Sequence, residues 1–196
     1  MEVLLIRHGQ TLGNLEKRYV GSTDEEVLPE SLDKLKSRVF HPVDAVFVSP
    51  KIRCLQTAKV IYKDMAPCII EDFTECNFGN FEYKNYLELS GDEDYQKWID
   101  SNGEIAFPGG ESKEEFIRRC VHGFDQVMLQ ATSKNYATIA LVVHGGTIMS
   151  ILDSYSKPHK DYYEWQVGNA EGYQVQVDTN LWMLGVKELI VERRLG

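Results

Sequence analysis

Short apolar stretches alternate with longer amphipathic segments along this chain. Four of the short stretches are rich in β-branched residues and have the length of buried strands: residues 3–6, 45–48, 68–70 and 138–143. Patterns of helical length lie between them. The alternation predicts an α/β protein in which a mostly parallel sheet is covered by helices on both faces, a three-layer α/β/α sandwich.

Local signals place two helix starts. Ser49 and Pro50 are typical of an N-cap and a first helical position, so we expect a helix to begin there. Ser112 and Glu115 have the spacing of a capping box, and apolar residues recur on one helical face from there to Ala131. This second pattern predicts a long helix that packs on the sheet.

The C-terminal part and one internal segment have their own patterns. Apolar and polar residues alternate over 173–177, residues 178–180 have the composition of a turn, and 181–186 runs on, which predicts an antiparallel hairpin at the sheet edge. Residues 77–110 are irregular, aromatic and acidic. Because insertions above the carboxyl ends of strands shape the ligand site in such folds, we expect a substrate lid there, with aromatic side chains that mainly pack.

Composition restricts the possible partners. The 196 residues, 43% of them hydrophobic, fit a single domain over 1–196, and the net charge of −9 argues against a nucleic-acid partner. The four cysteines lack the paired spacing of a zinc site, so we expect reduced thiols and no metal. No apolar run reaches the ~20 residues of a membrane span, and no signal peptide precedes the first strand. We therefore expect a cytoplasmic protein without a membrane partner; the sequence does not indicate its oligomeric state.

Residues able to handle phosphate stand at the end of the first strand. Arg7 and His8 follow the apolar run directly, and Gly9 comes next. Successive side chains of a strand point to opposite faces, so Arg7 and His8 share a pocket only if the chain leaves extended geometry, which Gly9 permits. The site is expected at this edge of the sheet.

Three further segments are expected at the same edge. Arg53 lies in the helix after the second strand, Glu75 follows the third, and His144 ends the fourth. Taken singly, Arg53 and Glu75 would be ordinary surface residues and His144 a strand terminator. Together they surround the carboxyl ends of strands, where ligands bind in this architecture and where helix starts favour an anion.

These motifs resemble those of the histidine phosphatase superfamily, which includes the cofactor-dependent phosphoglycerate mutases. The matching segments occur in the family's order: Leu5-Ile6-Arg7-His8-Gly9-Gln10-Thr11 with Asn14, Ser49-Pro50 with Arg53 and Gln56-Thr57-Ala58, Glu75 with Phe78-Gly79-Asn80-Phe81-Glu82, and His144-Gly145-Gly146. The resemblance implies hydrolysis of a small phosphate ester through a phosphohistidine on His8, with no cofactor.

The resemblance also implies a role for each site residue. Those implied as catalytic are His8, Glu75, His144, Arg7 and Arg53, and those implied as substrate-binding are Arg7, Asn14, Arg53 and Gly145. Glu75 would protonate the leaving oxygen and later accept a proton from water. Asn14 would be a secondary phosphate contact, or else a cap of the helix that follows. Because the arginines should lower the pKa of Glu75, we expect this group to regain its proton only when a phosphate dianion binds.

Departures from the family pattern bear on the reaction. The mutases resemble one another in a Glu-Arg-His-Tyr-Gly pattern at the acid residue, whereas this chain reads Glu75-Cys76-Asn77-Phe78-Gly79, which favours a phosphatase. The short chain and the Gly109-Gly110-Glu111-Ser112 junction are similar to bacterial α-ribazole phosphatases of cobalamin assembly. A phosphoglycerate mutase and a catalytically silent phosphate-binding module stay open as alternatives. Gln10 replaces a common Glu, and residues 28–32 also depart from the pattern.

Overall fold

The computed structural model describes residues 1–196 and contains one seven-stranded sheet in the order β3-β2-β4-β1-β6-β7-β5. The strands are β1 Glu2–Arg7, β2 Ala45–Val48, β3 Cys68–Ile69, β4 Thr138–Val143, β5 Ser156–Lys157, β6 Gly172–Gln176 and β7 Leu189–Leu195. The ladders that join β3, β2, β4 and β1 are parallel, and β6 is antiparallel to both β1 and β7. The expected mostly parallel sheet with an antiparallel C-terminal part is confirmed.

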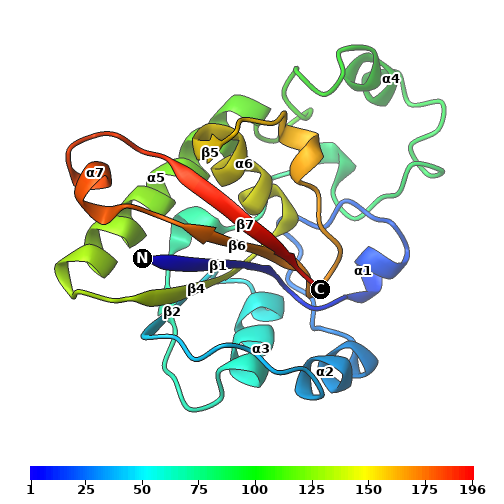
Figure 1. Ribbon diagram of the computed structural model, residues 1–196. Coiled ribbons are helices and arrows are strands. Elements are labelled where there is room, and N and C mark those ends of the chain that lie inside the picture. Colours follow the sequence, from blue (N-terminus) through cyan, green and yellow to red (C-terminus); the bar gives the residue numbers. More distant parts are fainter.

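Helices cover both faces of this sheet, which gives the three layers seen in Figure 1. The α-helices are α1 Leu12–Leu15, α2 Pro29–Lys36, α3 Ile52–Ile61, α4 Glu93–Asp100, α5 Lys113–Ser133, α6 Gly145–Tyr155 and α7 Thr179–Met183. Three 3-10 helices are η1 Glu71–Phe73, η2 Gly79–Phe81 and η3 Tyr162–Trp165. The helix α3 lies on one face with α2, and α5 and α6 lie on the other.

Side-chain alternation in β1 explains why this strand reads as an unbroken apolar run. Val3 and Leu5 pack into the cluster that includes residues of α5 and α6, whereas Leu4 and Ile6 pack into the cluster under α3. All four side chains are at most 2% exposed. A strand buried on both faces has no polar side to show, as expected for the centre of a helix-covered sheet.

The helix α5 begins as its sequence predicts. The Ser112 hydroxyl accepts a hydrogen bond from the Glu115 amide, and the Glu115 carboxylate accepts one from the Ser112 amide, so the capping box is complete. The apolar face that follows buries Phe116, Cys120 and Phe124. The local signal suffices here because both halves of the cap lie in one turn.

The predicted start of α3 is two residues too early. The helix begins at Ile52 rather than Pro50, and the Ile52 amide donates to Asp24 Oδ1 at 2.8 Å. The cap therefore comes from a distant loop. The hydroxyl of Ser49, which we expected to cap the helix, instead lies 2.8 Å from Nε2 of His144.

The second strand of the predicted C-terminal hairpin is also misplaced. Asp178 accepts hydrogen bonds from the amides of Asn180 and Leu181 and caps the short helix α7, so residues 181–186 do not form a strand. Trp182 of this helix is buried. The chain returns to the sheet only at β7, where of seven residues only Leu189 is fully buried.

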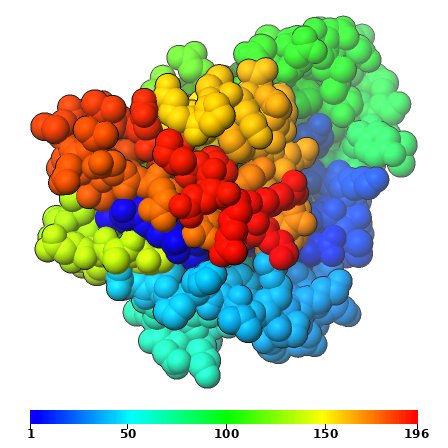
Figure 2. All heavy atoms as spheres, in the orientation of Figure 1, coloured from blue at the N-terminus to red at the C-terminus, as the bar shows by residue number.

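The segment 77–110 holds η2 and α4 and lies beyond the carboxyl ends of the parallel strands. It forms the green lobe beside the α1 segment in Figures 1 and 2. Its aromatic rings pack on one another: the ring centroids of Trp98 and Phe107 are 5.0 Å apart, and those of Phe81 and Tyr95 are 5.4 Å apart.

Two further properties concern the chain as a whole. The four cysteines, Cys54, Cys68, Cys76 and Cys120, form no disulfide. None of the helices combines the length and the hydropathy needed to cross a membrane.

Candidate active site

The structure brings the five predicted catalytic side chains to one edge of the sheet. The rings of His8 and His144, which follow β1 and β4, have centroids 5.1 Å apart at an interplanar angle of 69°. Oε2 of Glu75 lies 3.7 Å from Nδ1 of His144. A Cβ atom at Gly145 would lie 3.5 Å from Nε of Arg7, and Arg53 is close enough to affect the pKa of both histidines.

His8 is held in one tautomer. Its Nδ1 lies 2.7 Å from the carbonyl oxygen of Gly9, and because a carbonyl only accepts, Nδ1 carries the proton. Burial, followed by the charges of Arg53 and Arg7, holds the pKa of His8 well below its usual value. The imidazole is therefore neutral, with an unshared pair on Nε2, which is the form that a nucleophile needs.

The loop that carries His8 is fixed by residues to which the sequence assigned no role. The Gly9 amide donates to Oγ1 of Thr57 at 2.9 Å. The amide of Ala170 donates to the carbonyl oxygen of His8 at 3.1 Å, and Nδ2 of Asn169 reaches the same oxygen at 3.3 Å. Thr57 belongs to a motif already noted, but the bracing residues before β6 carry no local signal beyond a Gly-Asn turn.

Arg53 is buried, Arg7 is partly buried, and both are incompletely paired. Arg53 is 1% exposed and donates from Nη1 to the carbonyl oxygen of Thr23, while Arg7 donates from Nη1 to that of Val167. The Nε atoms of both arginines are buried without a protein acceptor. Buried charged donors are costly unless they are paired, and a guanidinium fits two oxygens of one phosphate. The pair is thus suited to an oxyanion.

The pKa of Glu75 is shifted in the direction opposite to the one expected from the sequence. Its Oε1 accepts a hydrogen bond from the Cys76 amide at 3.0 Å. Burial raises the pKa of Glu75 above its usual value, and this effect outweighs the opposing influence of the Cys76 amide and of Arg53 and Arg7. The expectation that the arginines lower this pKa until phosphate binds is therefore wrong, because it left desolvation out.

His144 is the N-cap residue of α6, and the glycines after it allow close approach. It is fully buried, and burial with the charge of Arg53 and the proximity of His8 keeps its pKa well below the usual value. A Cβ atom at Gly146 would lie 3.0 Å from Oε1 of Glu75 and 2.7 Å from a Phe116 ring carbon. The first amides of α6 have no intrahelical acceptor and add donors at this edge.

A cavity of about 340 Å³ adjoins these groups. Arg7 and Glu75 are in its lining, whereas the buried His8, Arg53 and His144 are not. Asn14 and Gln166 are the uncharged polar side chains that line it. Its aromatic lining comes from the segment 77–110 and from elsewhere in the chain: Tyr19, Phe78, Trp98, Phe107, Phe116, Tyr162 and Tyr163. Tyr162 and Tyr163 were not predicted to belong to the site, because they lie beyond the last motif.

Asn14 has features of both predicted roles, the helix cap and the contact with substrate. Thr11, not Asn14, is the N-cap residue of α1, and Oδ1 of Asn14 completes the capping box by accepting from the Thr11 amide at 3.3 Å. The same oxygen accepts from Nδ2 of Asn169 at 2.8 Å. Asn14 therefore takes part in a cap and also lines the cavity.

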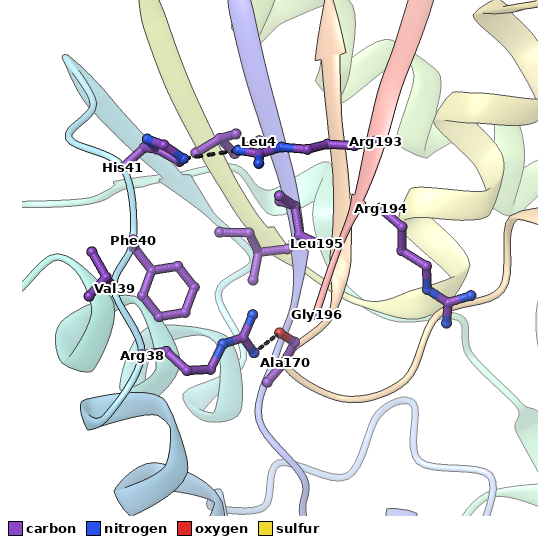
Figure 3. A pocket seen from close by; sticks show the side chains of 11 residues that line it. Leu4, Arg38, Val39, Phe40, His41, Ala170, Arg193, Arg194, Leu195 and Gly196 are labelled. Carbon is purple, nitrogen blue, oxygen red and sulfur yellow. Dashed lines mark hydrogen bonds between the residues drawn. The ribbon is translucent and has the colours of Figure 1, made fainter.

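The remaining histidines, His41, His122 and His159, lie apart from the His8–His144 pair. His122 lies 2.6 Å from Asp72, and His159 lies 3.9 Å from Asp161. His41 lines a second hollow of about 330 Å³ between the segment after α2 and the end of β7, where its Nε2 lies 2.9 Å from Nη2 of Arg193 (Figure 3). No group of three or more His, Cys, Asp or Glu side chains is arranged to hold a metal ion.

Comparison with known proteins gives a consistent set of similarities. Residues 3–187 match the family described as the histidine phosphatase superfamily (branch 1). A broad-specificity phosphatase of Saccharomyces cerevisiae is 29% identical over 161 residues, 78% of this chain and 69% of the yeast protein. A 2,3-bisphosphoglycerate-dependent phosphoglycerate mutase of Afipia carboxidovorans is 24% identical over 164 residues, 76% of this chain and 78% of the mutase. The crystal structure of an α-ribazole phosphatase from Shigella flexneri has the same fold, with a TM-score of 0.80 at 20% identity over 100% of this chain and 96% of that one.

Proposed function

The chain belongs to the histidine phosphatase superfamily, and from this premise we propose that it hydrolyses a small phosphate monoester through a phosphohistidine on His8. One observation carries the proposal. A neutral imidazole with its unshared pair on Nε2 lies near two arginines, Arg7 and Arg53, whose Nε atoms are buried without a protein acceptor. A nucleophile and an oxyanion clamp in one place are the parts that phosphoryl transfer requires.

In the first step Nε2 of His8 attacks phosphorus in line with the leaving oxygen. The N–P bond forms as the P–O bond breaks, and the electron pair of that bond stays on the leaving oxygen. The carboxyl group of Glu75, whose pKa is raised by burial, donates its proton to this oxygen. The hydrogen bond from Nδ1 of His8 to the Gly9 carbonyl stabilises the positive charge that develops on the ring.

In the second step water attacks the phosphohistidine. Glu75, now a carboxylate, accepts a proton from the water as its oxygen bonds to phosphorus. The N–P bond breaks, its electron pair returns to Nε2 of His8, and Glu75 is again protonated. Arg7 and Arg53 match the charge on the equatorial oxygens in both steps.

The lining of the cavity favours an uncharged, flat leaving group such as the nucleoside of α-ribazole 5′-phosphate. Seven aromatic side chains face the space beyond the phosphate position. The two other cations of the lining are already engaged: Arg18 pairs with Glu16 and Glu88, and Lys113 pairs with Glu104. A ring therefore gains contacts in this cavity, whereas a carboxylate would be desolvated without a free partner.

The mutase alternative is supported by relatives of that name, and it makes a different prediction. A mutase substrate, a phosphoglycerate, carries a carboxylate, for which the cavity has no unpaired cation beyond the phosphate clamp. A mutase would also return the phosphoryl group to substrate rather than release it. Steady phosphate release without a bisphosphate primer would exclude it, and no release from any ester would favour a silent binding module.

The test is a panel of α-ribazole 5′-phosphate, 3-phosphoglycerate and sugar phosphates, compared by kcat/KM. We expect the highest value for α-ribazole 5′-phosphate. Tyr163→Ala should lower it about tenfold and leave a small sugar phosphate nearly unchanged, because an aromatic contact contributes about 1 kcal/mol. Tyr163 is 56% exposed, so Tyr86→Ala, at 53% exposure outside the cavity, is a matched control that should have no effect.

A further inference from the structure

Ser49 lies at the end of β2 directly beside His144. Its Oγ is 2.8 Å from Nε2 of His144, and both residues are completely buried. The Ser49 amide donates to the carbonyl oxygen of Val142 at 3.2 Å, which continues the parallel pairing of β2 with β4. The sheet itself therefore holds the hydroxyl against this one ring nitrogen.

The surroundings of the hydroxyl decide which atom donates. Oγ of Ser49 accepts a hydrogen bond from the Lys51 amide at 3.4 Å, and no carbonyl or carboxylate oxygen lies within hydrogen-bond distance of it. The hydroxyl hydrogen thus has one strong acceptor within reach, Nε2 of His144, because the other neighbour, the Cys54 sulfur, accepts only weakly. If Nε2 were itself protonated, the buried hydroxyl hydrogen would be left with that weak acceptor alone, an arrangement that folded proteins avoid.

We propose that Ser49 is a positioning residue that fixes His144 as the tautomer protonated on Nδ1, so that His144 donates to the phosphoryl group and cannot attack it. The tautomer follows from the hydrogen bonds alone, and its role at the phosphoryl group rests on the proposed function. Nδ1 is the ring nitrogen that lies 3.7 Å from Glu75. Its proton therefore points to the side where substrate would lie.

The thiol of Cys54 does not select either ring nitrogen of His144. Its Sγ lies 3.6 Å from Nε2 and 3.9 Å from Nδ1, so it is nearly equidistant from both and lies in line with neither. The Ser49 hydroxyl is therefore the group that distinguishes the two nitrogens.

The two histidines then differ for a physical reason. In His8 the Gly9 carbonyl draws the proton to Nδ1 and leaves Nε2 free to attack. In His144 the Ser49 hydroxyl occupies Nε2 and leaves the protonated Nδ1 facing the site. Two neutral imidazoles 5.1 Å apart thus become one nucleophile and one donor through the groups behind them.

The test combines a measurement of the tautomer with kinetics. In ¹⁵N-labelled protein without ligand, long-range ¹H–¹⁵N spectra should find the His144 proton on Nδ1, and Ser49→Ala should shift it toward Nε2. Single-turnover transfer from p-nitrophenyl phosphate should slow by about 10- to 100-fold in Ser49→Ala, in line with loss of an oriented donor. Ser49→Thr, which keeps a hydroxyl, should restore the tautomer and most of the rate.

Ser156→Ala is the matched control. Ser156 is also buried, and its hydroxyl has no partner, so both readouts should stay as in the wild type. The proposal is overturned if the wild-type protein carries the His144 proton on Nε2, which needs no variant to establish, or if a folded Ser49→Ala protein keeps both tautomer and rate. An Nδ1 proton in a protein that forms no phosphohistidine would contradict the proposed function and leave the tautomer assignment standing.

Discussion

At the scale of single residues, burial controls protonation more strongly than neighbouring charge does. Burial is the largest influence on the pKa of His8, which it lowers, and on that of Glu75, which it raises. The arginines reinforce the first shift and oppose the second. Folding therefore favours the unprotonated form of His8 and the protonated form of Glu75.

Glu75→Gln tests the acid. An amide cannot protonate the leaving oxygen, so alkyl phosphates should react about 10²-fold more slowly or worse, while p-nitrophenyl phosphate should lose less than about tenfold, because its phenolate leaves unaided. Single-turnover phosphoryl transfer is the measurement, since loss of the base would also slow the attack of water. Equal losses for both esters would show that Glu75 is not the acid.

Glu82→Gln is the control for that comparison. Its carboxylate accepts hydrogen bonds from the amides of Gly21 and Thr23 and does not line the cavity. Any loss of rate should then be the same for the alkyl ester and the aryl ester.

His8→Ala separates chemistry from binding. Turnover should fall by more than about 10³-fold, because the nucleophile is gone, while inorganic phosphate should still bind through Arg7 and Arg53. Titration calorimetry with phosphate checks the binding. Normal turnover in this variant would contradict a phosphohistidine on His8.

The residues that face the substrate were easier to predict than those that support them. Arg7, His8 and His144 stand beside strand ends and within recognisable motifs. The supporting groups Ser49 and Asn169 act through contacts over 95 and 161 residues of sequence, to His144 and His8 respectively. A contact of that range leaves no periodic or spacing signal in the chain.

At the scale of elements, local caps were predictable and tertiary caps were not. The long helix α5 starts where Ser112 and Glu115 place it. The start of α3 depends instead on Asp24 from a separate loop, so the local Ser-Pro signal was misleading. The strand β7 was missed because most of its residues are exposed, and its apolar run covers only residues 189–191.

Ser112→Ala measures the contribution of the α5 cap. Loss of the side-chain acceptor should lower the free energy of unfolding by about 1 kcal/mol. Urea denaturation gives this value, with Ser133→Ala at the exposed end of the same helix as control, where we expect a change within about 0.5 kcal/mol. A loss no larger than that of the control would mean that packing of α5 alone fixes its start.

At the scale of the whole molecule, the site spans almost the entire length of the chain. Arg7 and His8 come from the first strand, and the loop that braces them immediately precedes β6. The four parallel strands were predictable because they are continuously apolar, and they alone place the catalytic groups at one edge. The hydrogen bonds from Asn169 and Ala170 to the loop of His8 arise because β6 pairs with β1. This strand order cannot be predicted from the periodicity of the sequence.

Stability should depend on pH through the buried histidines. The pKa of His8 is lowered by folding, so below about pH 6.5 the unfolded chain binds a proton that the folded one does not, and the free energy of unfolding falls as the pH falls. The slope for one such group is at most about 1.4 kcal/mol per pH unit. The raised pKa of Glu75 has the opposite effect on stability: its contribution to the free energy of unfolding is present at low pH and is lost as the pH rises.

Urea unfolding of wild type and His8→Ala between pH 7.5 and 5.5 isolates this effect. The wild type should lose stability more steeply on acidification than the variant, which lacks the group that takes up the proton on unfolding. Parallel slopes would show that His8 is protonated in the folded protein.

The central place of β1 has a consequence for synthesis on the ribosome. Its parallel partner β4 is translated more than 130 residues later, and its antiparallel partner β6 later still. At about 5–20 residues per second, the apolar strand that carries the nucleophile waits on the order of 10 s for a partner. During that time it is an apolar strand without a partner, and such unpaired edges are prone to aggregate.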